Sequence, residues 1–193
     1  MEAARGIFIV TGNKSKLREF RLLLGGVGIR VINRKVDLIE PKTLDQKEVA
    51  ISTAKQAHQI IKQPLIVDDT GIYFCKYNNF PGTYSKFLFQ TVGLEGLKQL
   101  IREGNKKAYF QTTLCFIDGK VIKIFQGRLY GKISLKKSSK FNEEWGYDSI
   151  FIPQGSRKFL SEYSLEERVK ISHRAKAVKK LVNFLFKRYK WEV

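Results

Sequence analysis

The period of the apolar residues changes half-way along the chain. Up to about residue 101, short strand-like runs such as Gly6–Val10 and 65–67 alternate with segments whose apolar residues recur every three or four positions. From residue 108 the period becomes two, and Asp118-Gly119 offers a two-residue hairpin turn between residues 108–117 and 121–125. Parallel pairing suits the first half and antiparallel pairing the second. We therefore predict an α/β fold with a mixed, long and twisted central sheet and flanking helices.

Composition excludes several classes of protein. The 193 residues, 43% hydrophobic and 28% charged, suit one globular domain. No segment approaches the ~20 apolar residues that a membrane span needs, and residues 1–10 lack the apolar core of a signal peptide. Cys75 and Cys115 are too few for a disulfide scaffold or a zinc cluster. We expect a cytoplasmic protein with reduced cysteines and no membrane partner.

The charge indicates an anionic partner. With 36 Lys and Arg against 18 Asp and Glu, the net charge is +18, which attracts nucleic acid, membrane surfaces or phosphate-rich small molecules. The basic residues are spread along the whole chain with modest clusters and no long basic tail. This pattern favours a general positive field and no dedicated nucleic-acid partner.

Two adjacent acids mark the centre of the chain. Pro64 opens a strand over residues 65–67, and Asp68 and Asp69 follow, with a sharp turn expected at Gly71. Successive side chains of a strand point to opposite faces, so one acid is expected to work in a cleft and the other to support it. The alternative is a strand that ends in an ordinary Asp-Thr-Gly turn.

Three other segments carry candidate functional residues. The turn 11–16 feeds a helix, whose N-terminal N–H groups attract phosphate, although a plain capped helix is the alternative. Residues 145–148, Trp-Gly-Tyr-Asp, can stack on and bond a flat ring or form a packed aromatic corner. Ser172 suits the N-cap of the last helix, and His173 is one of two histidines.

These segments together resemble the inosine triphosphate pyrophosphatase family, whose members act on XTP and dITP. The motifs, in family order from about Ile7 to Leu185, are Thr11-Gly12-Asn13-x-x-Lys16, Asp37-Leu38-x-Glu40, Asp68-Asp69-Thr70-Gly71, Phe80-Pro81-Gly82-x-Tyr84-Ser85-Lys86, Gly146-Tyr147-Asp148 and Ser172-His173-Arg174. The resemblance implies a single nucleotide-pyrophosphatase domain, residues 1–193, with two lobes around a central cleft. It also implies a homodimer and Mg²⁺-dependent hydrolysis of ITP, dITP and XTP to the monophosphate and pyrophosphate, which removes non-standard purines from the nucleotide pool.

The resemblance also implies site residues. Asp69 would be the general base, and Glu40 and Asp69 would bind metal. Substrate would be bound by Thr11, Gly12, Asn13, Lys14, Ser15, Lys16, Thr70, Trp145, Gly146, Tyr147, Asp148, Arg168, His173 and Arg174.

The sequence departs from the family at four positions. Thr53 stands where a phosphate-binding Lys is usual, and Lys55 lies on a different helix face. Trp145 replaces Phe, Ser149 replaces Pro, and Arg168 replaces Lys, which exchanges a compact ammonium for a planar fork.

The same chemistry follows from the residue types. A triphosphate needs cations and a divalent metal, which Lys14, Lys16, Arg168 and an acid-held Mg²⁺ supply. The donors of Arg174 suit the 6-oxygen of hypoxanthine and xanthine and would oppose the 6-amino group of adenine. The rival function is a basic nucleic-acid-binding protein without catalysis, which would have no use for Glu40 or Asp69.

Overall fold

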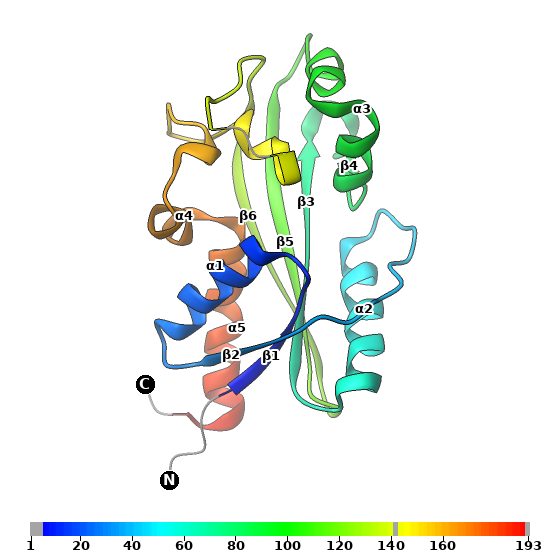
Figure 1. The fold of residues 1–193 in the computed structure, drawn as a ribbon, viewed down its shortest axis with the longest axis vertical. Helices are drawn as coiled ribbons and strands as arrows, with labels where there is room; N and C mark the ends of the chain where they lie inside the picture. Colours follow the sequence, from blue (N-terminus) through cyan, green and yellow to red (C-terminus); the bar gives the residue numbers. More distant parts are fainter. Residues whose placement is uncertain (1–5, 141–142, 192–193) are drawn as a thin grey trace.

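The protein is built on one long twisted sheet (Figure 1). A computed structural model describes residues 6–140 and 143–191, with the side chains of residues 143–145 excluded. The sheet has seven strands: β1 (Gly6–Val10), β2 (Arg30–Arg34), β3 (Leu65–Phe74), β4 (Pro81–Gly82), β5 (Lys107–Ile117), β6 (Ile122–Ile133) and β7 (Phe151–Pro153).

The strand pairing confirms the predicted mixed sheet. The order is β2-β1-β3-β5-β6-β7, with β4 paired to β3 outside this path. The pairs among β2, β1 and β3 are parallel, and the pairs from β3 onward are antiparallel. β3 therefore lies where the two kinds of pairing meet, and it carries both acids.

Helices cover the sheet on both faces (Figure 1). The amphipathic α1 (Lys14–Gly25) and α5 (His173–Tyr189) bury their apolar sides on one face, and α2 (Gln46–Ile61) packs on the other through alanines. α3 (Ser85–Leu100) lies at the far end of the sheet with its own core cluster, and α4 (Leu165–Ile171) precedes α5. Short 3-10 turns are η1 (Cys75–Tyr77), η2 (Glu143–Ser149) and η3 (Leu160–Glu162). Among the described helices, none is both long and apolar enough to cross a bilayer.

Side-chain caps fix where these helices begin. The Asn13 Oδ1 accepts hydrogen bonds from the N–H groups of Ser15 and Lys16, at 2.8 and 3.0 Å. Asp45 caps α2, and the Ser172 hydroxyl accepts from the Ala175 N–H at 3.0 Å. The predicted N-cap role of Ser172 is thus confirmed.

Two strand predictions were wrong. β3 does not turn at Gly71 but continues to Phe74, because Gly71 is there for a close approach: a Cβ would lie 2.2 Å from the carbonyl oxygen of Gly82. β6 is one continuous strand from Ile122 to Ile133, so the strand predicted over 121–125 does not end there and the residues after it do not form a separate strand.

A second close approach joins β6 to α5. At Gly127, a Cβ would lie 2.1 Å from the carbonyl oxygen of His173 and 2.6 Å from the backbone nitrogen of Ala177. Only a glycine permits this contact. It brings the N-terminal turn of α5, with His173 and Arg174, down onto the middle of the sheet.

Candidate active site

Asp68 is a buried carboxylate held by two cations. Its Oδ1 lies 2.5 Å from the Lys16 ammonium, and its Oδ2 accepts a hydrogen bond from the Arg174 Nε at 2.8 Å. Thr70 donates a further bond to Oδ1 at 2.9 Å. Burial alone would raise the pKa of Asp68, but Arg174 and Lys16 hold it well below its usual range. Asp68 is therefore ionised at neutral pH and serves as a structural anchor.

Asp69 has the opposite surroundings. Its neighbours in the strand ladder differ from those of Asp68 because alternate residues face opposite sides of the sheet. Its Oδ2 is buried and has no hydrogen-bond partner among the described residues. Burial raises the pKa of Asp69 to about 6, with Lys16 opposing the shift and the charges of Asp68 and Glu40 adding to it. A carboxylate with that pKa and a vacant lone pair suits a general base near neutral pH.

Glu40 and Asp69 are two acids whose carboxylate oxygens suit a divalent metal. Glu40 is exposed in the loop before Pro41, and its charge contributes to the raised pKa of Asp69. No group of three or more potential metal ligands from His, Cys, Asp and Glu occurs in the described part of the chain. Mg²⁺ typically takes one or two carboxylates and completes its shell with water and substrate phosphate. The unpartnered oxygen of Asp69 fits such a site.

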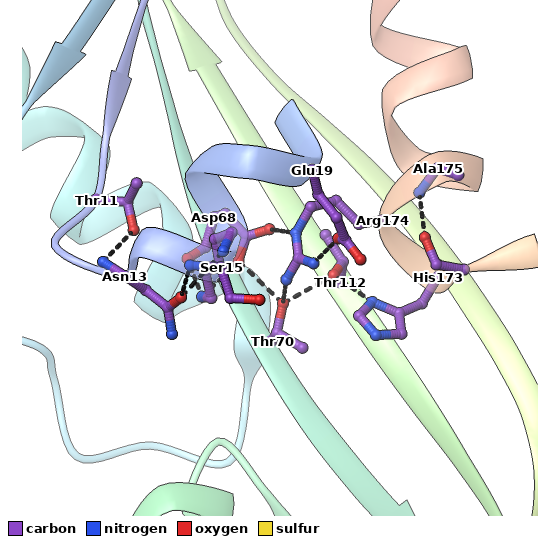
Figure 2. Close-up of polar contacts among 12 residues, drawn as sticks. Thr11, Asn13, Ser15, Glu19, Asp68, Thr70, Thr112, His173, Arg174 and Ala175 are labelled. Carbon is purple, nitrogen blue, oxygen red and sulfur yellow. Dashed lines mark hydrogen bonds and ion pairs between the residues drawn. The ribbon is translucent and has the colours of Figure 1, made fainter. Parts of the chain in front are cut away.

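Arg174 of α5 links two acids from two other elements, β3 and α1 (Figure 2). Besides Asp68, its guanidinium binds Glu19 of α1 through Nη1 and donates from Nη2 to the Thr70 hydroxyl at 3.2 Å. Arg174 and Glu19 are both buried, at 5% and 3% exposure. These contacts occupy three of the five N–H groups of the guanidinium and fix its plane.

The chain of ion pairs continues from Glu19 to Arg168 and Asp148. Arg168 lies 3.6 Å from Glu19 and 2.7 Å from the Asp148 Oδ2. Burial raises the pKa of Asp148, and Arg168 acts against this shift. The predicted residues Asp148, Arg168 and Arg174 are thus brought together, and Glu19 is a member that the sequence reasoning missed.

His173 is a buried neutral imidazole. Its Nδ1 lies 2.7 Å from the Thr112 hydroxyl, which in turn lies 2.8 Å from the Thr70 hydroxyl. Burial first, and then the charge of Arg174, lower the pKa of His173 well below its ordinary value. The ring also packs against Phe110, with centroids 5.3 Å apart. His173 can therefore donate or accept a hydrogen bond at neutral pH but carries no charge there.

The turn from Thr11 to Lys16 is a capped helix start that leaves side chains exposed. Thr11 accepts a bond from the Asn13 N–H at 3.1 Å, and Gly12, Lys14 and Ser15 are exposed. Because Asn13 already occupies the N–H groups of Ser15 and Lys16, phosphate contacts would fall to the exposed side chains or would displace the cap.

The aromatic segment, residues 145–148, contributes Tyr147 to the core and Asp148 to the ion pairs of the candidate site. Tyr147 is completely buried, and its hydroxyl donates to the Ser85 carbonyl at 2.9 Å. Its ring therefore packs in the core, and a contact of this segment with substrate stays a prediction. Gly146 accepts a bond from the Ser149 hydroxyl at 2.5 Å. The side chain of Trp145 lies outside the described residues.

Thr53, which stands where the family usually has a phosphate-binding lysine, is buried, and the nearby Lys55 is exposed. The Thr53 hydroxyl is buried and donates to the Val49 carbonyl at 2.8 Å within its own helix. Lys55 is exposed on another side of α2.

A buried amide network on the α2 face was also missed. The Gln46 side chain lies beside Asp69, and its Oε1 accepts from Gln111 at 2.8 Å and from Thr113 at 2.7 Å. Arg128 donates to Gln111 at 2.5 Å. The position of Gln46 at the start of α2, directly after the Asp45 cap, was the available sequence signal.

Comparison with known proteins places this constellation in a family. The model of the Ham1 family matches residues 7–184, almost the whole chain. The chain belongs to the Ham1 family. A dITP/XTP pyrophosphatase of Saccharolobus solfataricus is 39% identical over 181 residues, 93% of each chain. An inosine triphosphate pyrophosphatase of Kluyveromyces lactis is 35% identical over 188 residues, 93% of this chain and 95% of that one.

Solved structures of Ham1 proteins share the fold. The Staphylococcus aureus Ham1 protein superposes with a TM-score of 0.79 at 25% identity, covering 95% of this chain and 99% of that one. A Ham1 protein of Coxiella burnetii gives 0.80 at 24% identity, covering 94% and 98%. The mixed sheet with its flanking helices is therefore the Ham1 architecture.

Proposed function

We propose that the protein hydrolyses ITP, dITP and XTP between the α- and β-phosphates and so removes non-standard purines from the nucleotide pool. The single observation that carries the proposal is Asp69, a carboxylate with a buried unpartnered oxygen and a pKa near 6, in a chain of the Ham1 family. A nucleic-acid-binding protein without catalysis has no use for such a group, and relatives named as pyrophosphatases favour the enzyme.

Asp69 would take the proton from the attacking water. The water oxygen then bonds to phosphorus, the α–β anhydride bond breaks, and pyrophosphate departs with the electron pair of that bond. Because the pKa of Asp69 is about 6, the group is ionised at neutral pH and still basic enough to accept a proton.

Cationic side chains would hold the phosphates. Lys14 is exposed at the start of α1, and Lys16 lies between Asp68 and the protein surface. Arg168 is partly exposed while it binds Asp148, so part of its fork is open to a ligand. These charges would offset those of a triphosphate.

Glu40 and Asp69 would hold Mg²⁺. When bound, the ion neutralises charge on the phosphates and polarises the reacting phosphoryl group. Both residues supply hard oxygen ligands, which Mg²⁺ prefers. The contribution of the chain is to keep these two carboxylates close while Arg174 and Lys16 neutralise the neighbouring Asp68.

Base recognition would fall to Trp145, Asp148, His173 and Arg174. Two N–H groups of Arg174 remain after its three contacts, and they are donors that suit a 6-oxygen. His173 is neutral and adjacent, and Trp145 would stack on any purine. Thr11, Gly12, Asn13, Ser15, Thr70 and Gly146 would complete the substrate site.

The deciding experiment mixes purified protein with dITP and Mg²⁺ and identifies the products. We expect dIMP and pyrophosphate in equal amounts, with Asp69→Asn as the inactive control. Absence of pyrophosphate, or release of single phosphates, would refute the proposal.

The proposal includes a homodimer that works in the cytoplasm. Light scattering on a sizing column would give twice the chain mass for a dimer, and a monomer mass would reject this part alone. Cell fractionation tests the compartment.

A further inference from the structure

A feature that the proposed function does not use is the charge on one side of α5. Neither α5 nor β6, the strand on which it packs, contains an aspartate or glutamate. Residues of a helix turn by about 100° each, so the exposed lysines of α5 fall within an arc of about 100°. These are Lys176, Lys179, Lys180 and Lys187.

The lysines border a groove. An open groove of about 590 Å³ lies between α5 and β6, lined by residues 126–128 of the strand and by Lys176, Lys179, Lys180 and Asn183 of the helix. The lining has no carboxylate and no aromatic ring. It presents donors and positive charge to whatever enters.

Two of the lysines already have a structural role. β7 pairs with β6 only at residues 131–133, so the preceding part of β6 is an edge of the sheet. The Lys176 ammonium donates to the Arg128 carbonyl at 2.8 Å, and Lys180 donates to the Gln126 carbonyl at 2.7 Å. Because lysines of α5 already bond these edge carbonyls and the helix covers this part of the edge, the groove does not suit an extended peptide that would add as a strand.

Bonding to the edge carbonyls of β6 does not account for Lys179 and Lys187. Within the described part of the chain, neither makes a hydrogen bond or an ion pair with another residue, and both are exposed. Lys176 and Lys180 each use one of three donors on the edge carbonyls and keep the others. The face therefore has four ammonium groups with spare donors, and neither α5 nor β6 supplies an acid to neutralise them.

We propose that this surface, made of Lys176, Lys179, Lys180, Asn183 and Lys187, binds the phosphate backbone of double-stranded nucleic acid without reading its sequence. From residue 176 to 187 the helix extends about 16 Å. A duplex presents one phosphate charge per about 1.7 Å of its axis, so a straight row of point charges meets several phosphates at once.

The composition of the surface favours a duplex over other polyanions. Single strands are held by aromatic side chains that stack on bases, and the groove has none. Membrane binding by a surface helix needs large apolar residues on its exposed side, and the exposed large apolar residues described in the chain do not come from α5. This second binding function replaces the sequence-based expectation of no dedicated nucleic-acid partner, and it is independent of the active site.

Paired variants with equal charge test the proposal. K179Q/K187Q removes two positive charges from the surface, and the control K62Q/K107Q removes two from exposed lysines at the end of α2 and the start of β5. Binding to a short duplex DNA, without divalent metal, is measured by fluorescence anisotropy over a range of NaCl concentrations. Each lost phosphate contact reduces the magnitude of the slope of log K against log salt by about 1. We therefore expect this magnitude to fall by about 2 for K179Q/K187Q and to stay almost unchanged for the control.

The other outcomes are equally decisive. Equal changes in the two variants would show a diffuse field and overturn the proposal. Tighter binding to single strands, or to vesicles that contain anionic lipid, would assign the surface to a different partner and also overturn it. dITP turnover should be the same in all three proteins. If K179Q/K187Q unfolds at a lower temperature than the wild type, the single variants, each with an expected slope change of about 1, carry the same test.

Discussion

Arg174 binds Asp68, a residue 106 positions earlier in the chain, with Nε 2.8 Å from Oδ2. The contact joins the first turn of α5 to the strand β3 where parallel and antiparallel pairing meet. Because Arg174 and Lys16 both neutralise Asp68, the adjacent Asp69 is left as the carboxylate without a matching cation of its own. Two neighbouring acids thereby have pKa values shifted in opposite directions and different tasks.

Asp69→Asn should abolish turnover while the protein stays folded. The amide keeps the shape of the side chain but can neither accept the proton nor carry the charge that a metal needs. We expect kcat with dITP to fall at least about 100-fold, the lower range for loss of a general base. Circular dichroism checks the fold, and a near-normal kcat would remove Asp69 from the base role.

Asp69→Asn, which removes the carboxylate charge, should also stabilise the folded protein at neutral pH in the absence of metal. The pKa of Asp69 rises from 3.8 in the unfolded chain to about 6 in the folded one, so the folded state holds its proton more tightly. Stability contributed by the protonated form is therefore lost as the pH rises from about 4 to about 6. Above pH 6, burial of the ionised Asp69 carboxylate lowers the free energy of unfolding by about 3 kcal/mol.

The measurement compares urea unfolding of the wild type and Asp69→Asn across this pH range in EDTA. The difference in unfolding free energy between the two proteins should grow from pH 4 to pH 6 and then level off. A pH-independent difference would contradict the raised pKa.

Asp68→Asn should instead destabilise the protein. The change leaves Lys16 and the buried Arg174 without their shared counter-ion, and breaking one side of a buried ion pair costs about 3–5 kcal/mol. Because the folded pKa of Asp68 lies below its unfolded value, its stabilising effect is fully present above about pH 4 and is lost only in stronger acid. Urea unfolding at pH 7 measures the loss, and a change below 1 kcal/mol would reject Asp68 as the anchor.

Glu40→Gln should raise the Mg²⁺ concentration needed for half-maximal rate. Glu40 is exposed, so the change removes a charged oxygen without disturbing the core. A titration of initial rate with Mg²⁺ at saturating dITP gives the shift, and Glu48→Gln, an exposed acid on α2, is the matched control. An unchanged titration would exclude Glu40 as a ligand.

Arg174→Ala should narrow the preference for dITP over dATP. A donor lost opposite the 6-oxygen costs about 1–3 kcal/mol with dITP and little with dATP. Stability should also fall, because Asp68 and Glu19 lose their common partner. The measurement is kcat/KM for both substrates, with Trp145→Ala expected to weaken both alike. An equal loss for Arg174→Ala would leave it only a positioning role.

The sequence predicted the elements better than it predicted their contacts. Apolar periodicity located β1, β5, α2 and α5, since each buries one face or both. The turn at Gly71 was wrong because Asp-Thr-Gly is locally turn-like, whereas the glycine is needed for the carbonyl of Gly82, which arrives from another part of the chain. Local patterns contain no record of such approaches.

The residues of the site were also predicted only in part, because local patterns do not record contacts between distant parts of the chain. Asp69 and Glu40 were predicted as site residues from local sequence and resemblance, and the different environments of Asp68 and Asp69 follow from strand alternation. Glu19 was missed because an acid within a charged helix segment is ordinarily solvent-exposed. Its burial depends on Arg174, 155 residues away.

Because of the contact at Gly127, natural substitutions at this position should affect activity through the placement of α5. Any side chain there would push α5 off β6 and carry His173 and Arg174 away from β3, although residue 127 is expected to touch neither nucleotide nor metal. Loss-of-activity alleles should therefore accumulate at a glycine that a survey of ligand contacts would never flag. Recovery in such alleles would come through second changes that reseat the helix, not through changes in the catalytic acids.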